Sequence, residues 1–428
     1  MKNLFLPFFL FFVFPLFAQQ NDRVSYGGEI NDILLQNKDE LPLVFDLRKT
    51  SRLSPVKTQP DGGCWASATM SSVESLFKTF DYGDFKLSDI NLKLFNGFDS
   101  ARSTNGNHFM ATAYFTRGAG PLLSSPQTDS VFALAPETAA YITDARFLPD
   151  DSEIIKNVII NFGAVYSMIY FNKNNFDTLS CILYSQKHKI NHVVDLVGWN
   201  DTMQTKNGSG VWISQNSLGN KFGDSGFFYI PYTDYNVLKF NAIWNKWIPY
   251  DSNARIYYYD TLGTYFSYGY NDSLIYGLVK YIALSDCEIT KIGTSVNCNN
   301  TKIYTEIYGK FNRHTGALTD KKAVIGERIC NYPGYYTFDL ENPIELKKGE
   351  EFYILMRYIS PGESMPMPVE EVVKGYSNPV LTSGKCFINH DIEKWPDAWF
   401  ETGKDAEYDF LKFNLCIKAY CIDTGGGD

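Results

Sequence analysis

The segment PVKTQPDGGCWA, residues 55–66, places a cysteine directly after a glycine pair and at the start of a helical pattern. One apolar stripe at helical spacing follows this cysteine and consists of Ala66, Met70, Val73 and Phe77. The helix is predicted to end before Gly83. A helix N-terminus stabilises negative charge, so the Cys64 thiol is predicted to ionise easily and to act as a nucleophile. Gln59 is close enough in the chain to place its amide N–H beside the sulfur and stabilise an oxyanion.

A thiol nucleophile needs a proton acceptor and donor, usually a histidine, and the chain has 5 histidines. His192 opens the predicted strand HVVDLVGW, residues 192–199, where strand geometry would hold its ring rigidly. The other four histidines have ordinary explanations. His314 and His390 lie in the predicted C-terminal domain, His188 lies in a charged loop, and His108 lies in a turn before a helix. Asn216 follows a predicted strand and is expected to accept the ring N–H of His192 and fix its tautomer.

These segments resemble the papain-like cysteine peptidases. His192 and Asn216 follow Cys64 by about 130 and about 150 residues, the spacing expected in that family. The resemblance implies that Cys64 is the nucleophile, His192 the general acid and base, and Asn216 the residue that orients His192. It also implies that Gln59 is the oxyanion donor.

The resemblance extends to residues that bind the substrate backbone. Asn105-Gly106 with Ala111 resembles the family's glycine edge beside the S2 pocket. Substrate contacts are therefore expected from Gly106, Asn107, Gly63 and Asn191.

Some positions depart from the family pattern. Gln59 lies one residue closer to the nucleophile than usual, which shortens the oxyanion loop. Asn107 replaces the second glycine of the substrate edge. Leu218 replaces the tryptophan that covers the Asn–His bond, and Phe222 is expected to help keep a bulky apolar cover.

The expected fold class is α+β. Further helices are predicted over residues 109–117 and 152–162, and strands over residues 164–171, 193–199, 210–214 and 226–232. Helices come first and a sheet follows. The resemblance implies a papain-like two-lobed fold over residues 41–250, with a helical lobe facing a β lobe.

The C-terminal half has a different pattern. From about Ile256, short aromatic and β-branched segments alternate with turns, which predicts an all-β sandwich over residues 251–421 and a tail over residues 422–428. Segments such as 257–260 and 416–420 resemble the lectin-like β domain of some secreted microbial papain-like peptidases. That resemblance implies a glycan or cell-surface ligand, although aromatic residues such as Trp395 and Trp399 are more often packing residues.

The N-terminus has the pattern of a secretory signal over residues 1–18, in which Lys2 precedes an apolar run and Ala18 precedes polar residues. The run is shorter than the ~20 residues of a membrane span, so a retained anchor is the alternative interpretation. Residues 19–40 form a short N-terminal segment. The expected location is secreted, either extracellular or periplasmic.

Export favours disulfides, and six of the 8 cysteines follow residue 280. Up to three disulfides are expected there, with ~15 possible pairings. Cys181 is expected to be a small buried hydrophobe.

Composition limits the classes of partner. The chain has 428 residues, 39 Lys and Arg against 48 Asp and Glu, and no dense basic run, which disfavours nucleic acid as a partner. Neither a metal motif nor a cofactor is indicated.

Taken with the resemblance, the sequence predicts a secreted cysteine-type peptidase that cleaves protein or peptide substrates through a thioester. A non-catalytic homologue that binds peptide or glycan, and an acyltransferase that uses an amine, are the alternatives.

Overall fold

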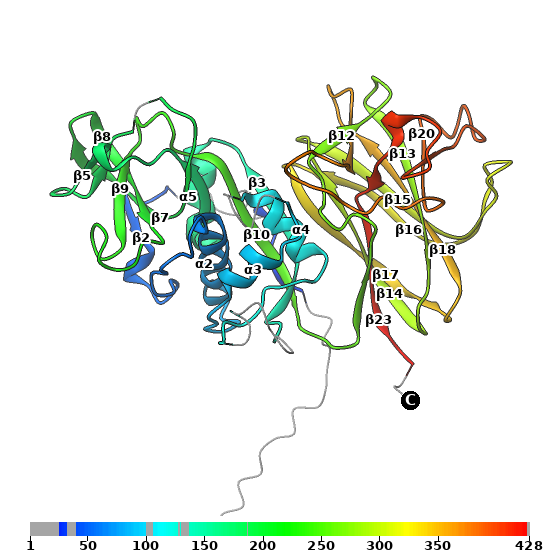
Figure 1. Ribbon diagram of the computed structural model, residues 1–428, viewed down its shortest axis with the longest axis horizontal. Helices are drawn as coiled ribbons and strands as arrows, with labels where there is room; N and C mark the ends of the chain where they lie inside the picture. Colours follow the sequence, from blue (N-terminus) through cyan, green and yellow to red (C-terminus); the bar gives the residue numbers. More distant parts are fainter. Residues whose placement is uncertain are drawn as a thin grey trace, which may run out of the picture.

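The computed structural model describes residues 25–31, 40–99, 106–126, 129, 137–185 and 187–425. The predicted signal segment, residues 1–18, lies outside the described residues. Figure 1 shows two parts side by side, one in which helices pack against strands and one built from strands. Helices and strands in the first part and strands in the second agree with the expected α+β class.

The helices lie in the first part and have α2 at their centre. Their bounds are α2 (Cys64–Thr79), α3 (Asp89–Phe95), α4 (His108–Thr116) and α5 (Ser152–Phe162). The predicted helices over 64–82, 109–117 and 152–162 are confirmed. The short helix α3 was not predicted from the pattern, and the Ser88 hydroxyl caps it by accepting the N–H of Asn91.

The strands of the first part are β1 (Tyr26–Gly27), β2 (Val44–Asp46), β3 (Ala140–Leu148), β4 (Val165–Ile169), β5 (Phe176–Asp177), β6 (Ile182–Leu183), β7 (His192–Thr205), β8 (Gly208–Gln215), β9 (Phe227–Pro231) and β10 (Lys239–Pro249). The four predicted strands correspond to β4, β7, β8 and β9. The long strands β3 and β10 were missed. In β3 the buried charged residues Asp144 and Arg146 interrupt the apolar pattern that would have indicated a strand.

The second part contains β11 (Ala254–Tyr257), β12 (Phe266–Tyr268), β13 (Leu274–Ile282), β14 (Cys287–Val296), β15 (Thr301–Phe311), β16 (Leu318–Cys330), β17 (Gly334–Leu346), β18 (Glu351–Ile359), β19 (Met367–Glu370), β20 (Cys386–Asn389), β21 (Phe400–Thr402), β22 (Asn414–Leu415) and β23 (Ile417–Asp423). The described residues also form short 3-10 helices. In the first part these are η1 (Leu47–Lys49) and η2 (Lys173–Asn175), and in the second part η3 (Asp409–Leu411). A six-stranded sheet in the order β16-β15-β18-β13-β20-β21 covers this part on one side.

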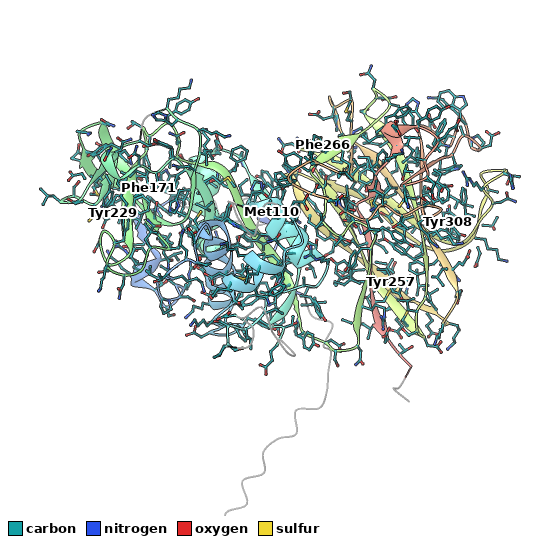
Figure 2. All side chains as sticks on the ribbon, in the orientation of Figure 1. Met110, Phe171, Tyr229, Tyr257, Phe266 and Tyr308 are labelled. Atoms are coloured by element: carbon teal, nitrogen blue, oxygen red, sulfur yellow. The ribbon has the colours of Figure 1, made fainter. Side chains whose placement is uncertain are left out.

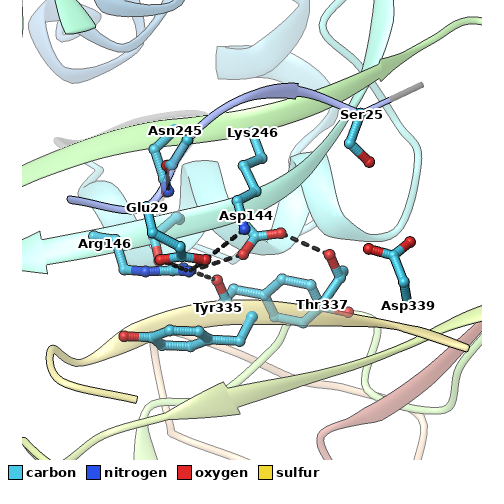
Figure 3. Close-up of polar contacts among 12 residues, drawn as sticks. Ser25, Glu29, Asp144, Arg146, Asn245, Lys246, Tyr335, Thr337 and Asp339 are labelled. Carbon is cyan, nitrogen blue, oxygen red and sulfur yellow. Dashed lines mark hydrogen bonds and ion pairs between the residues drawn. The ribbon is translucent and has the colours of Figure 1, made fainter. Parts of the chain in front are cut away.

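A single 14-stranded sheet runs through both parts. Strand β3 pairs with β10 on one side and with β17 on the other, where Gly334 lies opposite Arg146 and Tyr335 opposite Ala145. Beside this junction, Glu29 of the N-terminal segment pairs with Arg146 (Figure 3). The two parts are therefore joined by backbone pairing and by buried charge, in addition to the covalent connection.

Each part has its own hydrophobic core. The first surrounds the fully buried tryptophans Trp65, Trp199, Trp212, Trp244 and Trp247, and the second is built from strand residues of the sandwich. Tyr335 and Tyr420 of the second part belong to the first core, which again connects the two.

The structure holds all 8 cysteines, which lie within the described residues, as free thiols. The expectation of up to three disulfides after residue 280 stays a prediction. Cys421 acts to lower the pKa of Cys287, so these two thiols are neighbours. The prediction that Cys181 is buried is wrong, because it is partly exposed at a turn between β5 and β6.

No helix in the described part of the chain is long and apolar enough to cross a membrane.

Candidate active site

Cys64 is the first residue of α2 and lies against the start of β7. Its side chain is buried, and the backbone N–H of Val193, the residue after His192, acts to lower the pKa of its thiol. Gly63 caps the helix, and a Cβ there would lie 2.6 Å from Pro60, so only glycine fits this turn. The helix start therefore brings the thiol to the strand that carries His192.

His192 and Asn216 contact each other directly. The Nε2 atom of His192 lies 3.0 Å from Oδ1 of Asn216, and β7 pairs with β8, which ends one residue before Asn216. The same Oδ1 accepts the backbone N–H of Ser217 at 2.8 Å, so this oxygen is an acceptor. His192 Nε2 is thus the protonated ring nitrogen, which leaves Nδ1 able to accept a proton.

An aromatic cluster covers the imidazole. The ring of Phe171 lies 5.5 Å from that of His192, and the ring of Phe222 lies 5.8 Å from that of Phe171. Phe171 comes just after β4, and Figure 2 labels its position in the first part. Leu218, expected to share the cover, is 39% exposed. Sequence reasoning missed Phe171, since no motif marks it.

Gln59 is held beside Asn216 by its neighbour Ser217. The backbone N–H of Gln59 donates to the carbonyl of Ser217 at 2.8 Å, and the Ser217 hydroxyl donates to Oε1 of Gln59 at 2.6 Å. Because Oε1 accepts this bond, the amide Nε2 of Gln59 is the end left to donate elsewhere. Ser217 was not identified from the sequence, although its position next to Asn216 was a signal.

The expected substrate-binding residues lie at two places. Gly106 packs so closely on the indole of Trp65 that a Cβ would lie 2.3 Å from the ring, which puts this edge beside the residue after Cys64. Asn107 caps α4 by accepting the N–H of Met110. Asn191 pairs with the backbone of Phe171, at 2.8 Å through Oδ1 and 3.0 Å through Nδ2, and so extends the β4–β7 pairing one residue beyond His192.

Burial shifts the pKa of both groups. It raises the pKa of the Cys64 thiol above its usual value, although the backbone N–H groups of Val193, Trp65 and Cys64 act to lower it. Burial also lowers the pKa of His192, against the opposite effect of the bond to Asn216. Desolvation therefore opposes the ionisation of Cys64 that the helix N-terminus is expected to favour.

The described part of the chain contains no group of three or more His, Cys, Asp or Glu side chains placed to hold a metal ion. The arrangement at Cys64 consists of a sulfur, an imidazole with one free nitrogen, and an amide with a free N–H. This set is able to carry out acyl transfer at a carbonyl carbon.

We expect the Ser217→Ala variant to lower kcat about 10-fold with little change in KM, because Gln59 loses the bond that orients its amide. Gln59→Ala is expected to lower kcat by about 10²-fold, as for loss of one oxyanion donor. Steady-state hydrolysis of a peptide measures both. The exposed Ser209→Ala variant is the matched control, and a Gln59→Ala enzyme with wild-type kcat would remove Gln59 from the site.

Two segments of the chain match known protein families. Residues 41–242 match the profile of the papain family cysteine protease, and residues 256–421 match that of a lectin like domain. A cysteine proteinase of Theileria annulata is 25% identical over 227 residues, which cover 51% of this chain and 49% of the relative. A viral cathepsin of Adoxophyes honmai nucleopolyhedrovirus is 27% identical over 201 residues, 45% of this chain and 58% of the relative. The chain thus spans about half the length of these curated relatives.

Two solved structures are similar over most of the chain, which confirms the expected papain-like fold followed by a β-rich domain. One is the clostridial cysteine protease Cwp84 after propeptide cleavage, with a TM-score of 0.77 and 20% identity over 89% of this chain and 99% of that chain. The other contains the cysteine protease and lectin-like domains of Cwp84, a surface layer associated protein of Clostridium difficile. Its TM-score is 0.76, with 19% identity over 91% of this chain and 90% of that chain.

Proposed function

We propose that this chain, which joins a papain-family cysteine protease domain to a lectin-like β domain, is a cysteine peptidase that hydrolyses peptide bonds. The observation that supports this most is the 3.0 Å contact of His192 with Asn216. His192 opens β7, and α2, which begins at Cys64, packs against that strand. A buried structural thiol would need neither an oriented imidazole nor a glycine turn at its helix start.

The first half of the proposed reaction transfers the acyl group of the substrate to Cys64. As the Cys64 sulfur attacks the scissile carbonyl carbon, His192 Nδ1 takes the thiol proton, and the carbonyl oxygen becomes an oxyanion. The Gln59 amide and the Cys64 backbone N–H are the proposed donors to that oxyanion. His192 then gives its proton to the departing amine as the C–N bond breaks, which leaves a thioester.

Hydrolysis of the thioester returns the site to its first state. His192 takes a proton from water, the hydroxide oxygen attacks the thioester carbon, and the C–S bond breaks. The proton on His192 passes back to the sulfur as the acid product leaves. Asn216 keeps the imidazole in the orientation required by both steps.

We also propose that the protein is secreted and acts on proteins or peptides outside the cytoplasm. The apolar N-terminal pattern ending at Ala18 supports export. The proposed division is a peptidase domain over residues 41–250 and a lectin-like domain over residues 251–421, with a glycan or cell-surface ligand as the proposed partner of the latter.

The test is hydrolysis of a quenched fluorescent peptide library, together with mapping of an epoxide thiol probe by mass spectrometry. We expect peptide cleavage, and probe attached to Cys64 in the same preparation. Folded protein that leaves Cys64 unlabelled and the library intact would contradict the proposal and favour a binding role.

A further inference from the structure

A loop of the β domain contacts the helical lobe beside the Gly106–Asn107 edge. The backbone N–H of Asp99 donates to the carbonyl of Tyr376 at 3.0 Å, and Nδ2 of Asn107 donates to the Tyr376 hydroxyl at 3.1 Å. The ring of Phe98 packs against that of Tyr376 in a T-shaped contact at 5.2 Å. These contacts fix Tyr376 against Asn107, although 269 positions separate the two in the chain.

A row of aromatic rings continues from Tyr376 across the boundary between the domains. Tyr376 lies 4.8 Å from Tyr265, Tyr265 lies 5.9 Å from Phe109, and Phe109 lies 5.0 Å from Phe147, measured between ring centroids. Two of these residues belong to the β domain and two to the papain-type domain. Figure 2 labels Met110 of α4 and Phe266 of β12 on the two sides of the same boundary.

Part of this row borders a groove of about 300 Å³. Phe109, Phe147, Tyr265 and Phe266 line it together with Asn297 and Pro333, and no charged residue is among its described lining. Tyr265 is 49% exposed and Phe266 is 41% exposed, which is unusual for neighbouring large rings on a soluble surface. The groove is thus open, apolar and of a size for a side chain rather than a folded partner.

The groove lies near the Gly106–Asn107 edge, because Tyr265 of its lining packs on Tyr376, which bonds Asn107. Gly106 packs on Trp65, directly after Cys64, and Asn107 follows at the N-cap of α4. Phe109, in the first turn of that helix, lines the groove. A peptide bound along Gly106 and Asn107 would therefore extend from Cys64 toward Tyr376 and Tyr265.

We propose that the β domain supplies specificity-determining residues, Tyr265 in the groove and Tyr376 beside it, and that the groove takes an apolar, preferably aromatic, side chain of the peptide substrate. This inference rests on the proposed function, since the substrate is the peptide that Cys64 attacks. The side chain belongs to the amino-terminal side of the scissile bond, where the Gly106–Asn107 edge is expected to bind the backbone. Tyr376 fixes Asn107 at that edge, and Tyr265 forms the wall of the groove.

The test uses peptides that differ only in one residue, Phe, Gly or Asp, at the second, third or fourth position before the scissile bond. For the wild type we expect kcat/KM to favour Phe over Asp by about 10-fold or more at one of these positions. In Tyr265→Ala and Phe266→Ala the Phe-to-Asp ratio of kcat/KM should fall several-fold, because KM for the Phe peptide rises. Cleavage of the Gly peptide is retained. Tyr376→Phe, which keeps the ring and loses the bond to Asn107, should lower kcat/KM for all peptides with a smaller change in the ratio.

Tyr408→Ala is the matched control, because Tyr408 is an exposed tyrosine of the same domain that stacks on Phe410 away from the groove. An unchanged Phe-to-Asp ratio in Tyr265→Ala and Phe266→Ala, with active enzyme, would overturn the inference and leave the proposed function intact. If the wild type cleaves no peptide, the proposed function fails. The inference is then tested by calorimetric titration of the Phe and Asp peptides into Cys64→Ala protein. Equal affinities for the two peptides would overturn it.

Discussion

The Cys64→Ala variant is expected to lose peptide hydrolysis by about 10⁴-fold or more, and His192→Ala by a similar factor. Without the sulfur no thioester forms, and without His192 no group at the site accepts the thiol proton. Burial raises the pKa of the Cys64 thiol above its usual value, which increases the need for a base that removes its proton. Hydrolysis of a fluorogenic peptide measures the loss.

The two variants separate chemistry from folding in different ways. Cys64→Ala removes one small buried side chain, so its circular dichroism and unfolding midpoint should remain close to those of the wild type. His192→Ala keeps the thiol, so iodoacetamide still alkylates Cys64 but more slowly, because no base removes the proton. An alkylation rate equal to the wild type would show that His192 does not act on the sulfur.

Cys181→Ser is the matched control for these measurements. Cys181 is a partly exposed thiol of the same domain, and its sulfur contacts the carbonyl of Thr178 rather than any group of the site. We expect full activity from this variant. Activity lost in Cys181→Ser and kept in Cys64→Ala would exchange the two assignments.

Much of the candidate site could be predicted because its chemistry is encoded in short, ordered motifs. The glycine pair, the cysteine and the apolar stripe predict α2, and the apolar run after His192 predicts β7. The contact between His192 and Asn216 also follows the expectation from the sequence.

What the sequence did not predict depends on contacts between distant segments. Phe171 reaches His192 only through the pairing of β4 with β7, and Tyr376 reaches Asn107 only after the two domains dock. The reversed direction of the thiol pKa has the same origin, since desolvation of Cys64 depends on everything packed around it. Strand β3 was missed because its buried charges are neutralised by partners that no local pattern reveals.

Those charges meet at Arg146, whose side chain is 1% exposed. Its Nη2 bonds both carboxylate oxygens of Glu29 and Oδ2 of Asp144 at 2.9 Å, and its Nη1 donates to the carbonyl of Tyr335 at 2.6 Å (Figure 3). The ring of Tyr336 lies 3.3 Å from the guanidinium carbon. One side chain therefore connects the N-terminal segment, β3 and β17 of the β domain.

Replacing Arg146 by methionine is expected to lower the free energy of unfolding by about 3–5 kcal/mol. Asp144 would stay buried with the Thr337 hydroxyl, at 2.7 Å, as its remaining hydrogen-bond partner. Burial already raises the pKa of Asp144 and Arg146 opposes that effect, so the variant raises it further. A carboxyl with a raised folded pKa costs stability above that pKa, so the loss measured by urea unfolding should be larger at about pH 8 than at about pH 5.

The Asp144→Asn substitution in the Arg146→Met background is the decisive control, because it removes the charge that the arginine compensates. We expect the double variant to be more stable than Arg146→Met alone, with the two effects far from additive. Glu29→Gln should cost less than Arg146→Met, since the Glu29 side chain is 35% exposed and water replaces part of its interaction. A loss below about 1 kcal/mol for Arg146→Met, or no recovery in the double variant, would show that this buried charge does not hold the two domains together.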